Sequence, residues 1–380
     1  MSPAERVAAA FAQQTADKVP VYIAGISSRV ASALLGQEAW TSEGTLRFQE
    51  AAALWEGESA HEEFLERSRR DRAALAEALD LDLVRVTRWR CNERPTARLD
   101  DHTFRYGDPE GQWRVMRFDP STERYELTDR GARPEPTFDD IEAEVNRIEE
   151  SILTDDPEPE DYPEELAAVA AFGDERAVQI APFSVGIPLE AVWLRALEER
   201  RDLVSRYLSA SAQRAARTVQ ILSERGAKYF LNRCDFADER GPVYSRVIFK
   251  EQMVPILQRI SLACLATDTF HCFASRGNLR PVARELFGES DLQCCCDIDH
   301  TAQVDLGRIR KRFPYVTLMG GISSETLCTG DRKRVVKETM TALKAAKKRG
   351  GIVVGVSSEI PPNTSVENVE AMLETLREHR

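Results

Sequence analysis

The chain alternates strand-like and helix-like segments from end to end, and this alternation limits its fold more than any other feature. Eight short apolar runs are each followed by a segment with helical periodicity. We predict the strands at residues 19–25, 81–89, 177–184, 228–235, 267–274, 292–299, 316–323 and 351–358. Strands separated by helices favour a parallel sheet, and eight of them favour closure. The sequence therefore predicts an α/β fold, a (βα)8 TIM barrel, as a single domain spanning 1–380.

One region interrupts the alternation after the second predicted strand. Residues 103–106 and 112–118 alternate in side-chain character, and the segment 107–111 between them has turn-forming composition. We therefore predict a β-hairpin insertion within residues 91–135, over or beside the mouth of the barrel. The hairpin either closes the site or pairs with a second subunit in a homodimer.

Charge and cysteine usage exclude several classes of protein. Asp and Glu number 63 against 51 Lys and Arg, which disfavours nucleic-acid binding because phosphate contacts need a basic face. No apolar run approaches the roughly 20 residues of a membrane-spanning helix, and the first residues lack the apolar stretch of a signal peptide. Three of the eight cysteines are consecutive, which is not the pattern of a disulfide framework. We expect a cytoplasmic protein with a small-molecule substrate and neither a membrane nor a nucleic acid as partner.

Residues capable of chemistry follow several of the later strands, where a TIM barrel builds its active site. His271 and Cys272 are of the types that bind zinc, although neighbours in a strand point to opposite faces unless the strand bulges. The alternative is that His271 only forms hydrogen bonds and Cys272 packs as a small apolar residue. Asp235, after the fourth strand, either orients substrate, acts as a base or ligates metal, or it caps a helix or pairs with Arg233 or Arg240.

Other residues are candidates for binding substrate. In the sixth strand, alternation sends Cys294 and Cys296 to one face and Cys295 to the other, and carboxylates follow this run. Glycines after the seventh strand either expose backbone N–H groups to an anion or serve a tight turn. An arginine cluster near the end of the second strand either holds an anion through bidentate contacts or forms a solvated face; its members are Arg85, Arg88, Arg90, Arg94 and Arg98. The predicted substrate-binding residues are Arg88, Arg90, Asp297, Asp299, Gly321, Ser358 and Glu359.

A set of short motifs spread along the whole chain carries a resemblance to a known family. The motifs are Glu5-Arg6-Val7, Asp17-Lys18-Val19-Pro20, Cys234-Asp235-Phe236-Ala237, His271 with Gly277-Asn278, Asp305-Leu306, Gly320-Gly321-Ile322, Gly350-Gly351-Ile352, Ile360-Pro361-Pro362-Asn363-Thr364 and Glu367-Asn368. Together they resemble the uroporphyrinogen decarboxylase superfamily, which also contains the methylcobamide:coenzyme M methyltransferases. The resemblance indicates the superfamily and leaves the branch open.

The methyltransferase branch supplies the first functional hypothesis. It implies a corrinoid-linked methyltransferase acting on a small methylated substrate or a thiol, with a cobalamin-carrying protein docked over the mouth. That branch holds zinc with a His-x-Cys pair and a later cysteine. His271 matches the histidine, whereas Cys272 comes one residue early and Ser358 stands at the later cysteine. The resemblance thus implies a zinc site at His271 and Cys272 and catalytic roles for His271 and Asp235, so that His271→Ala would abolish turnover.

Two other hypotheses stay open. The first is decarboxylation of an acidic substrate, as in porphyrin biosynthesis, with the arginine cluster anchoring carboxylates. True decarboxylases carry several arginines after the first strand and an Asp near the end of the second, where this chain has Arg29 alone and Trp89-Arg90-Cys91. The second is a non-catalytic ligand-binding barrel, which Ser358 in place of a cysteine would permit.

Overall fold

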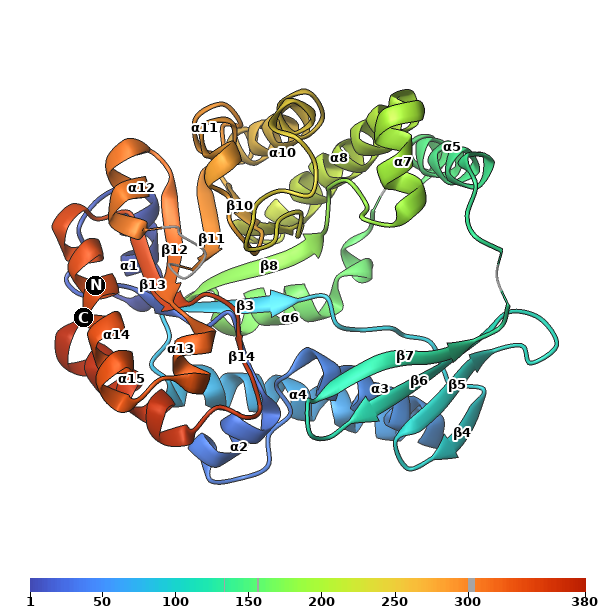
Figure 1. The fold of residues 1–380 in the computed structure, drawn as a ribbon. Helices are drawn as coiled ribbons and strands as arrows, with labels where there is room; N and C mark the ends of the chain where they lie inside the picture. Colours follow the sequence, from blue (N-terminus) through green and yellow to red (C-terminus); the bar gives the residue numbers. More distant parts are fainter. Residues whose placement is uncertain (133, 156, 300–304) are drawn as a thin grey trace.

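The computed structural model describes residues 1–132, 134–155, 157–299 and 305–380, and its centre is a closed barrel of parallel strands (Figure 1). The barrel strands follow one another in chain order, and the last pairs with the first to complete the ring. They are β1 (Val21–Tyr22), β3 (Leu83–Thr87), β8 (Ala177–Phe183), β9 (Tyr229–Arg233), β10 (Phe270–Ala274), β11 (Cys294–Ile298), β12 (Thr317–Ile322) and β13 (Ile352–Val356). The predicted (βα)8 TIM barrel is therefore confirmed.

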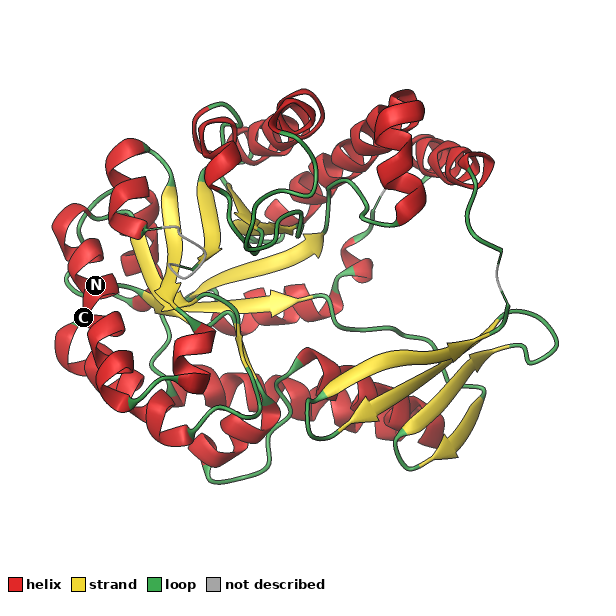
Figure 2. Ribbon diagram, viewed as in Figure 1, coloured by secondary structure: helices red, strands yellow, loops and turns green. Residues whose placement is uncertain are grey.

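Helices surround the barrel, as the red ribbons outside the yellow strands show in Figure 2. The longer ones are amphipathic: α14 buries Val335 and Leu343 and places lysines and an arginine in its last turn. The helices are α1 (Pro3–Phe11), α2 (Ser28–Leu35), α3 (Glu43–Glu56), α4 (Glu58–Ala78), α5 (Phe138–Thr154), α6 (Pro163–Phe172), α7 (Ala191–Glu199), α8 (Arg201–Ser223), α9 (Arg246–Ile248), α10 (Val254–Ala266), α11 (Ala283–Gly288), α12 (Leu306–Arg312), α13 (Ser324–Thr329), α14 (Arg332–Arg349) and α15 (Val366–His379).

Two separate cores lie on the two faces of the barrel wall. The larger one fills the space between the strands and the surrounding helices. The smaller one fills the interior of the barrel, and α1 closes its N-terminal end by packing the Phe11 ring 4.8 Å from that of Tyr229 and 4.7 Å from that of Phe270. Because both faces of each strand are buried, the sequence of each strand is a nearly continuous run of apolar residues.

The insertion is a four-stranded antiparallel sheet, made of β4 (Ala97–Asp100), β5 (Thr103–Gly107), β6 (Trp113–Asp119) and β7 (Arg124–Arg130). The predicted hairpin is the β5–β6 pair, and the structure adds a strand on each side. These outer strands are almost fully exposed and mostly polar, so they lack the apolar alternation that reveals a strand. The sheet packs on α3 through an aromatic cluster in which the Phe48 and Phe118 rings stack 4.5 Å apart.

A short pair of strands carries the chain across the mouth of the barrel. β14 (Glu359–Ile360) pairs in parallel with β2 (Gly25–Ile26), which brings the segment after β13 beside the segment after β1. This pairing places Glu359 against Gly25, whose missing side chain leaves room for the glutamate.

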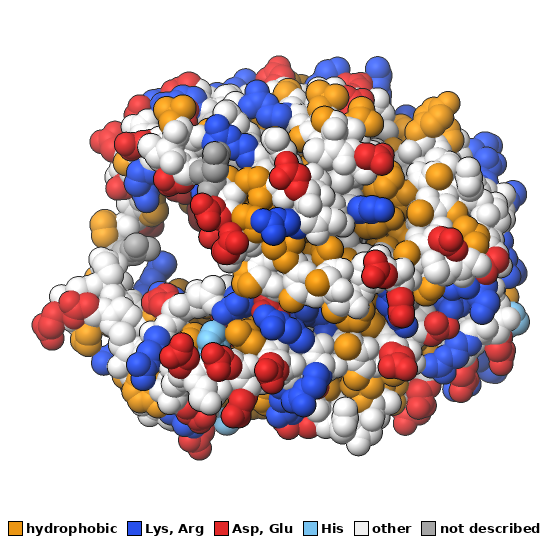
Figure 3. All heavy atoms as spheres, turned by 180° about the vertical axis from the view of Figure 1, so that it is seen from behind, with side chains coloured by type: hydrophobic (Ala, Val, Ile, Leu, Met, Phe, Trp, Pro, Cys, Tyr) orange, Lys and Arg blue, Asp and Glu red, His pale blue; other side chains and the backbone are white. Residues whose placement is uncertain are grey.

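The surface carries mixed charge. On the face drawn in Figure 3, Lys and Arg side chains are interspersed with Asp and Glu side chains over the described residues. Within the same residues, every helix falls short of the length and apolar character needed to cross a bilayer.

Candidate functional site

A hollow of about 750 Å³ opens at the C-terminal ends of the barrel strands. Its floor comes from β3, β9 and β11, and its walls come from the segments after β1 and β13, the start of α3 and the turn between β6 and β7. The charged residues that line it are Glu43, Arg47, Arg85, Glu123, Arg124, Glu126, Arg233, Arg276, Asp297 and Glu359. Among the described residues, the lining contains neither cysteine nor histidine. The hollow is thus a polar, ion-lined site at the expected end of the barrel.

A buried ion pair forms the floor of the hollow. Nη1 of Arg85 donates to both carboxylate oxygens of Asp297 at 2.7 and 2.9 Å, and its Nε donates to Oε1 of Gln179 at 2.7 Å. The two charged side chains are only 4% and 9% exposed. Burial raises the pKa of Asp297, and the charge of Arg85 opposes this shift. Nη2 of Arg85 is buried without a hydrogen-bond partner in the described part of the chain, so a bound anion would satisfy it.

Asp297 reaches the hollow because β11 is irregular at this point. Strand alternation would send Asp297 outward, since Cys296 before it faces the barrel interior. Instead Asp297 has a φ of 60°, and the pairing with β12 shifts register between Cys295 and Ile298. Aspartate is one of the few residue types that tolerate this left-handed conformation. The bulge therefore turns two successive side chains, a thiol and a carboxylate, toward the barrel axis.

Two arginines at the ends of neighbouring strands, Arg233 and Arg276, contribute positive charge to the hollow. Arg233 ends β9 and forms no ion pair within 4 Å in the described part of the chain, so its guanidinium is available to a ligand. Arg276 follows β10 and is held by Asp235, whose carboxylate accepts from its backbone N at 2.9 Å and from its Nε and Nη2 at 3.1 and 3.0 Å. Asp235 itself is not a lining residue, so it positions Arg276.

Glu359, one of the predicted substrate-binding residues, lies in the wall of the hollow on β14, with Ser358 beside it. Burial of Glu359 against the walls of the hollow, together with the nearby carboxylates of Glu123 and Glu43, raises its pKa to about 7 from the usual 4.5. The side chain nevertheless stays exposed to the water in the hollow. A carboxyl group with a pKa near neutrality is suited to general acid–base catalysis.

Glu123 ties the insertion to the barrel beside the hollow, a role that the sequence did not reveal. Its carboxylate accepts from the backbone N of Ser28 at 2.6 Å and of Arg29 at 2.7 Å, at the start of α2. A carboxylate at this position stabilises a helix N-terminus. The turn between β6 and β7 also lies directly against Gly44, where a Cβ atom would stand 2.0 Å from the Glu123 carbonyl oxygen. These contacts fix the insertion over one side of the hollow.

The predicted position of His271 at the mouth is corrected by the structure. His271 is fully buried, and its Nδ1 lies 2.9 Å from Oγ of Ser261 on α10, in the layer between barrel and helices. Burial lowers the pKa of His271 to about 3, so the imidazole is neutral. Since His271 and Cys272 are strand neighbours, the outward histidine and the inward cysteine follow from simple alternation. The two residues therefore cannot bind one ion together.

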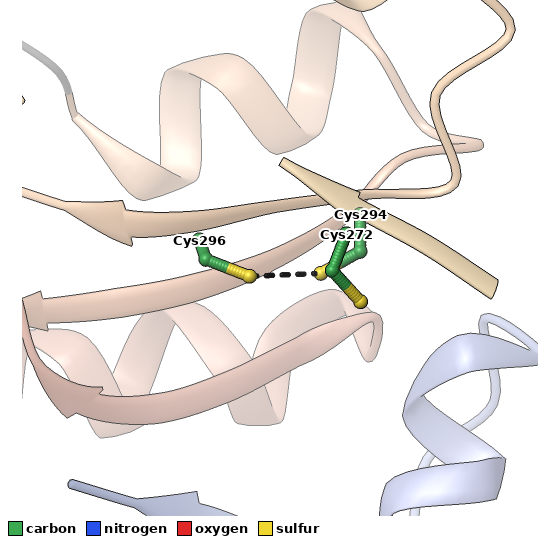
Figure 4. Close-up of side chains that lie close together, drawn as sticks. All are labelled: Cys272, Cys294 and Cys296. Atoms are coloured by element: carbon green, nitrogen blue, oxygen red, sulfur yellow. Dashed lines mark hydrogen bonds between the residues drawn. The ribbon is translucent and has the colours of Figure 1, made fainter. Parts of the chain in front are cut away.

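Cys272 lies instead inside the barrel with two cysteines of the next strand, as Figure 4 shows. One ligand atom of each of Cys272, Cys294 and Cys296 lies within 4.8 Å of the others. The predicted alternation of the cysteine run is confirmed, because Cys295 faces the outer core. The metal site implied by the resemblance thus does not fit the residues at the mouth, whereas the three inward cysteines offer soft sulfur ligands.

Four of the predicted substrate-binding residues lie elsewhere. Arg88 packs over the ring of Tyr162, and Arg90 pairs with Glu50 at 3.2 Å, so neither lines the hollow. Asp299 accepts hydrogen bonds from Oγ of Ser323 at 3.1 Å and of Ser357 at 2.8 Å, which links the ends of three strands.

Gly321 is the fourth of these residues. It faces α12 and α14, where a Cβ atom would stand 2.4 Å from Leu306, and its φ of 101° also favours glycine. Close packing therefore explains this glycine, and it does not line the hollow.

Five arginines of the hollow were not among the predicted site residues: Arg47, Arg85, Arg124, Arg233 and Arg276. The sequence carried a partial signal for two of them. Arg85 belongs to the arginine cluster of the second strand, and Arg233 directly precedes the Cys234-Asp235 motif. Their inward direction depends on strand register, which the sequence does not specify.

Comparisons with known proteins agree with the fold. A family model described as "Uroporphyrinogen decarboxylase (URO-D)" matches residues 184–379. The solved structure of a methyltransferase from Methanosarcina mazei matches with a TM-score of 0.64 and 15% identity, covering 100% of this chain and 99% of that one. A chitinase from Chromobacterium violaceum has a TM-score of only 0.35 and 11% identity, covering 60% of this chain and 86% of that one. No curated protein sequence matches the chain. At this identity, the first structure shows a shared fold along the whole chain.

Proposed function

The chain belongs to the uroporphyrinogen decarboxylase family, and we propose that it is a methyltransferase that removes a methyl group from a small anionic substrate. The substrate would bind in the mouth hollow, and the acceptor would be a corrinoid carried by a partner protein. The observation that carries the proposal is the ion-lined hollow itself, which combines the guanidinium of Arg233, without an ion pair in the described residues, with a carboxyl group whose pKa is about 7. The full-length fold likeness to a methyltransferase supports the reaction class.

The arginines of the hollow would anchor the anionic end of the substrate. Arg233 and Arg276 end neighbouring strands and face the same space, so a carboxylate between them would accept charge-assisted hydrogen bonds. The unpaired Nη2 of Arg85 offers a further donor at the floor. Such contacts fix the orientation of the substrate and bring its methyl group toward the open side.

Glu359 would supply the proton for the leaving group. When a methyl group is transferred, the carbon–heteroatom bond breaks and its electron pair stays on the heteroatom, which then needs a proton. A protonated Glu359 in the wall can donate that proton, and its raised pKa keeps a large share of the acid form near neutral pH. The corrinoid would supply a nucleophilic metal that accepts the methyl group. Arg124 and Arg276 are 70% and 59% exposed, so a partner protein could approach the hollow from their side.

The zinc chemistry implied by the resemblance is not part of this proposal. A thiol acceptor activated by zinc needs metal ligands beside the substrate, and the described lining residues are of other types. His271 points to the helix layer, and Ser358 is a poor zinc ligand. We therefore propose that the hollow holds the methyl donor rather than a thiol acceptor.

The test is demethylation of anionic methyl compounds by the purified chain. Methoxybenzoates and N-methylated amino acids would be incubated with reduced cobalamin, and the demethylated products would be measured by mass spectrometry. Arg233→Met should weaken substrate binding at least about tenfold, since hydrogen bonds to charged groups contribute roughly 1.5–3 kcal/mol. Arg240→Met is the matched control, because Arg240 is 92% exposed and pairs only locally with Asp238.

Two results would contradict the proposal. One is that no anionic methyl compound is demethylated, and the other is that the Arg233→Met and Arg240→Met variants bind substrate equally. Binding without any product would instead support a non-catalytic ligand-binding barrel.

Decarboxylation of an acidic substrate is the second candidate function. The arginines that would hold a methylated acid would equally hold a polycarboxylate, and the family takes its name from this reaction. Release of CO2 from uroporphyrinogen or another labelled acid, without any corrinoid, distinguishes this function from methyl transfer.

A further inference from the structure

The interior of the barrel contains a compact cluster of sulfur atoms one layer below the hollow. Sγ of Cys294 and Sγ of Cys296 are 3.7 Å apart, and Cys272 completes a trio whose ligand atoms all lie within 4.8 Å of one another (Figure 4). All three side chains are fully buried, and all three thiols are free. We refer to Cys272, Cys294 and Cys296 as the thiol trio.

Strand geometry brings the trio together. Cys272 on β10 and Cys294 on β11 are register partners in adjacent parallel strands, so their side chains project from the same level of the barrel wall. Cys296 lies two residues further along β11 and therefore points the same way as Cys294. Three thiols thus converge on one point from two strands, which is the arrangement of a metal site rather than of scattered core cysteines.

The surroundings of the trio are soft and enclosed. Sδ of Met319 lies 3.5 Å from Sγ of Cys296, which adds a thioether to the cluster. Nε2 of Gln179 donates to Sγ of Cys296 at 3.4 Å, and Gln179 is in turn held by Arg85 in the floor of the hollow. Below the trio, the aromatic contacts of α1 close the barrel. The site therefore has an amide donor that favours a sulfur anion and is shielded from water.

The spacing suits a single ion between the sulfurs. Two sulfur ligands at about 2.3 Å from one ion lie roughly 3.8–4 Å apart. The observed 3.7 Å between Cys294 and Cys296 is close to this distance, and Sγ of Cys272 lies within 4.8 Å of both.

We propose that the thiol trio, supported by the thioether of Met319, binds one Cu(I) ion inside the barrel. Thiolate and thioether ligands favour soft ions such as Cu(I), and a set of three cysteines without a fourth cysteine, histidine or carboxylate ligand in the described residues disfavours tetrahedral zinc. Packing alone accounts for buried cysteines as small apolar residues, but it does not require an amide and a thioether directed at one thiol. This site is independent of the methyl transfer proposed for the hollow.

Loading of the site is a ligand exchange without any change of oxidation state. Cu(I) arrives as a complex with a soluble low-molecular-weight thiol. Bonds form from the ion to the trio as its bonds to the carrier thiolates break, and the departing carrier thiolates take up the protons that the trio releases. Because the site is closed, loading occurs during folding or through local opening near α1.

The experiment is a Cu(I) competition titration of the full-length chain under anaerobic conditions. Bicinchoninate serves as the competing chelator, and bound copper is counted per chain. We expect one Cu(I) per chain, and X-ray absorption should show sulfur neighbours only. Cys296→Ala should lose the stoichiometric copper. Cys295→Ala is the matched control on the same strand, since Cys295 faces the outer core and should leave copper binding unchanged.

A second variant distinguishes a loss of copper binding from a loss of folding. Met319→Leu preserves the volume of the core, and it should weaken Cu(I) binding about tenfold, as loss of a supporting contact typically does. Circular dichroism and thermal unfolding of each variant confirm that it is folded. The proposal is overturned if the chain yields all its copper to the chelator, if it retains Zn(II) in preference to Cu(I), or if Cys295→Ala lowers copper binding as much as Cys296→Ala.

Discussion

The mouth hollow and the thiol trio occupy adjacent layers of one barrel, yet they have opposite chemistry. The hollow is lined by arginines and carboxylates and is open to water, whereas the trio is lined by sulfur and is fully enclosed. Along β11 the change from the sulfur-lined layer to the charged layer occurs between two adjacent residues, Cys296 and Asp297. The difference reflects desolvation: charged groups are stable where water or a counter-ion is present, and polarisable, weakly hydrated groups are stable where neither is.

The boundary between the two layers is the Arg85–Asp297 ion pair. The pair places two full charges within the barrel interior, and each guanidinium contact there replaces a lost contact with water. A substitution in this pair is therefore the most direct way to disturb one layer and measure the effect on the other.

The largest effect is expected from Arg85→Met. It leaves the Asp297 carboxylate buried without its partner, which typically costs about 3–5 kcal/mol. The free energy of unfolding from urea titration measures this loss, and Arg88→Met, which changes an exposed arginine that packs over Tyr162, should lower it by no more than about 1 kcal/mol. The double variant with Asp297→Asn should recover part of the stability. Equal stability of the Arg85→Met and wild-type chains would mean that the pair does not support the floor.

A smaller effect is expected from His271→Ala. This change removes a buried hydrogen bond to Ser261 and leaves a small void, so the free energy of unfolding should fall by about 1–3 kcal/mol. Because the imidazole faces α10, the rate per folded molecule should not change. Loss of turnover in a fully folded variant would restore the role implied by the family resemblance.

The smallest effect on stability is expected from Glu359→Gln, and its signature is pH dependence. The Glu359 carboxyl faces Glu43 on α3, Glu123 before β7, Arg124 on β7 and Arg233 on β9, and its pKa is raised from 4.5 to about 7. Its protonated form favours the folded state, so its stabilising effect is present below pH 4.5 and is lost as the pH rises through 7.

The Glu359→Gln variant should therefore gain stability relative to the wild type above pH 7. If Glu359 is the acid, the wild-type rate falls as the pH rises through about 7, and the variant loses most of its rate at every pH. Parallel stability curves of the two chains would show that Glu359 does not titrate in this range.

The sequence predicted the barrel, the site of the insertion and part of the hollow. The repeated strand–helix pattern was enough for the fold, since each strand and helix carries its own periodicity. Turn-forming residues revealed the β5–β6 hairpin, but the exposed outer strands β4 and β7 carried no apolar pattern. Ser358 and Glu359 were predicted because they follow the last barrel strand at its C-terminal end, and both line the hollow.

The direction of individual side chains was decided only by the tertiary structure. Barrel strands are buried on both faces, so an apolar run does not show which alternate residues point into the barrel. The sequence therefore could not tell whether His271 or Cys272 points inward. The left-handed backbone of Asp297 and the register of β10 against β11 depend on neighbouring strands that are distant in the chain. Local sequence thus determined which elements form, whereas long-range packing determined which of their residues meet, because side-chain contacts across a barrel exist only after it has closed.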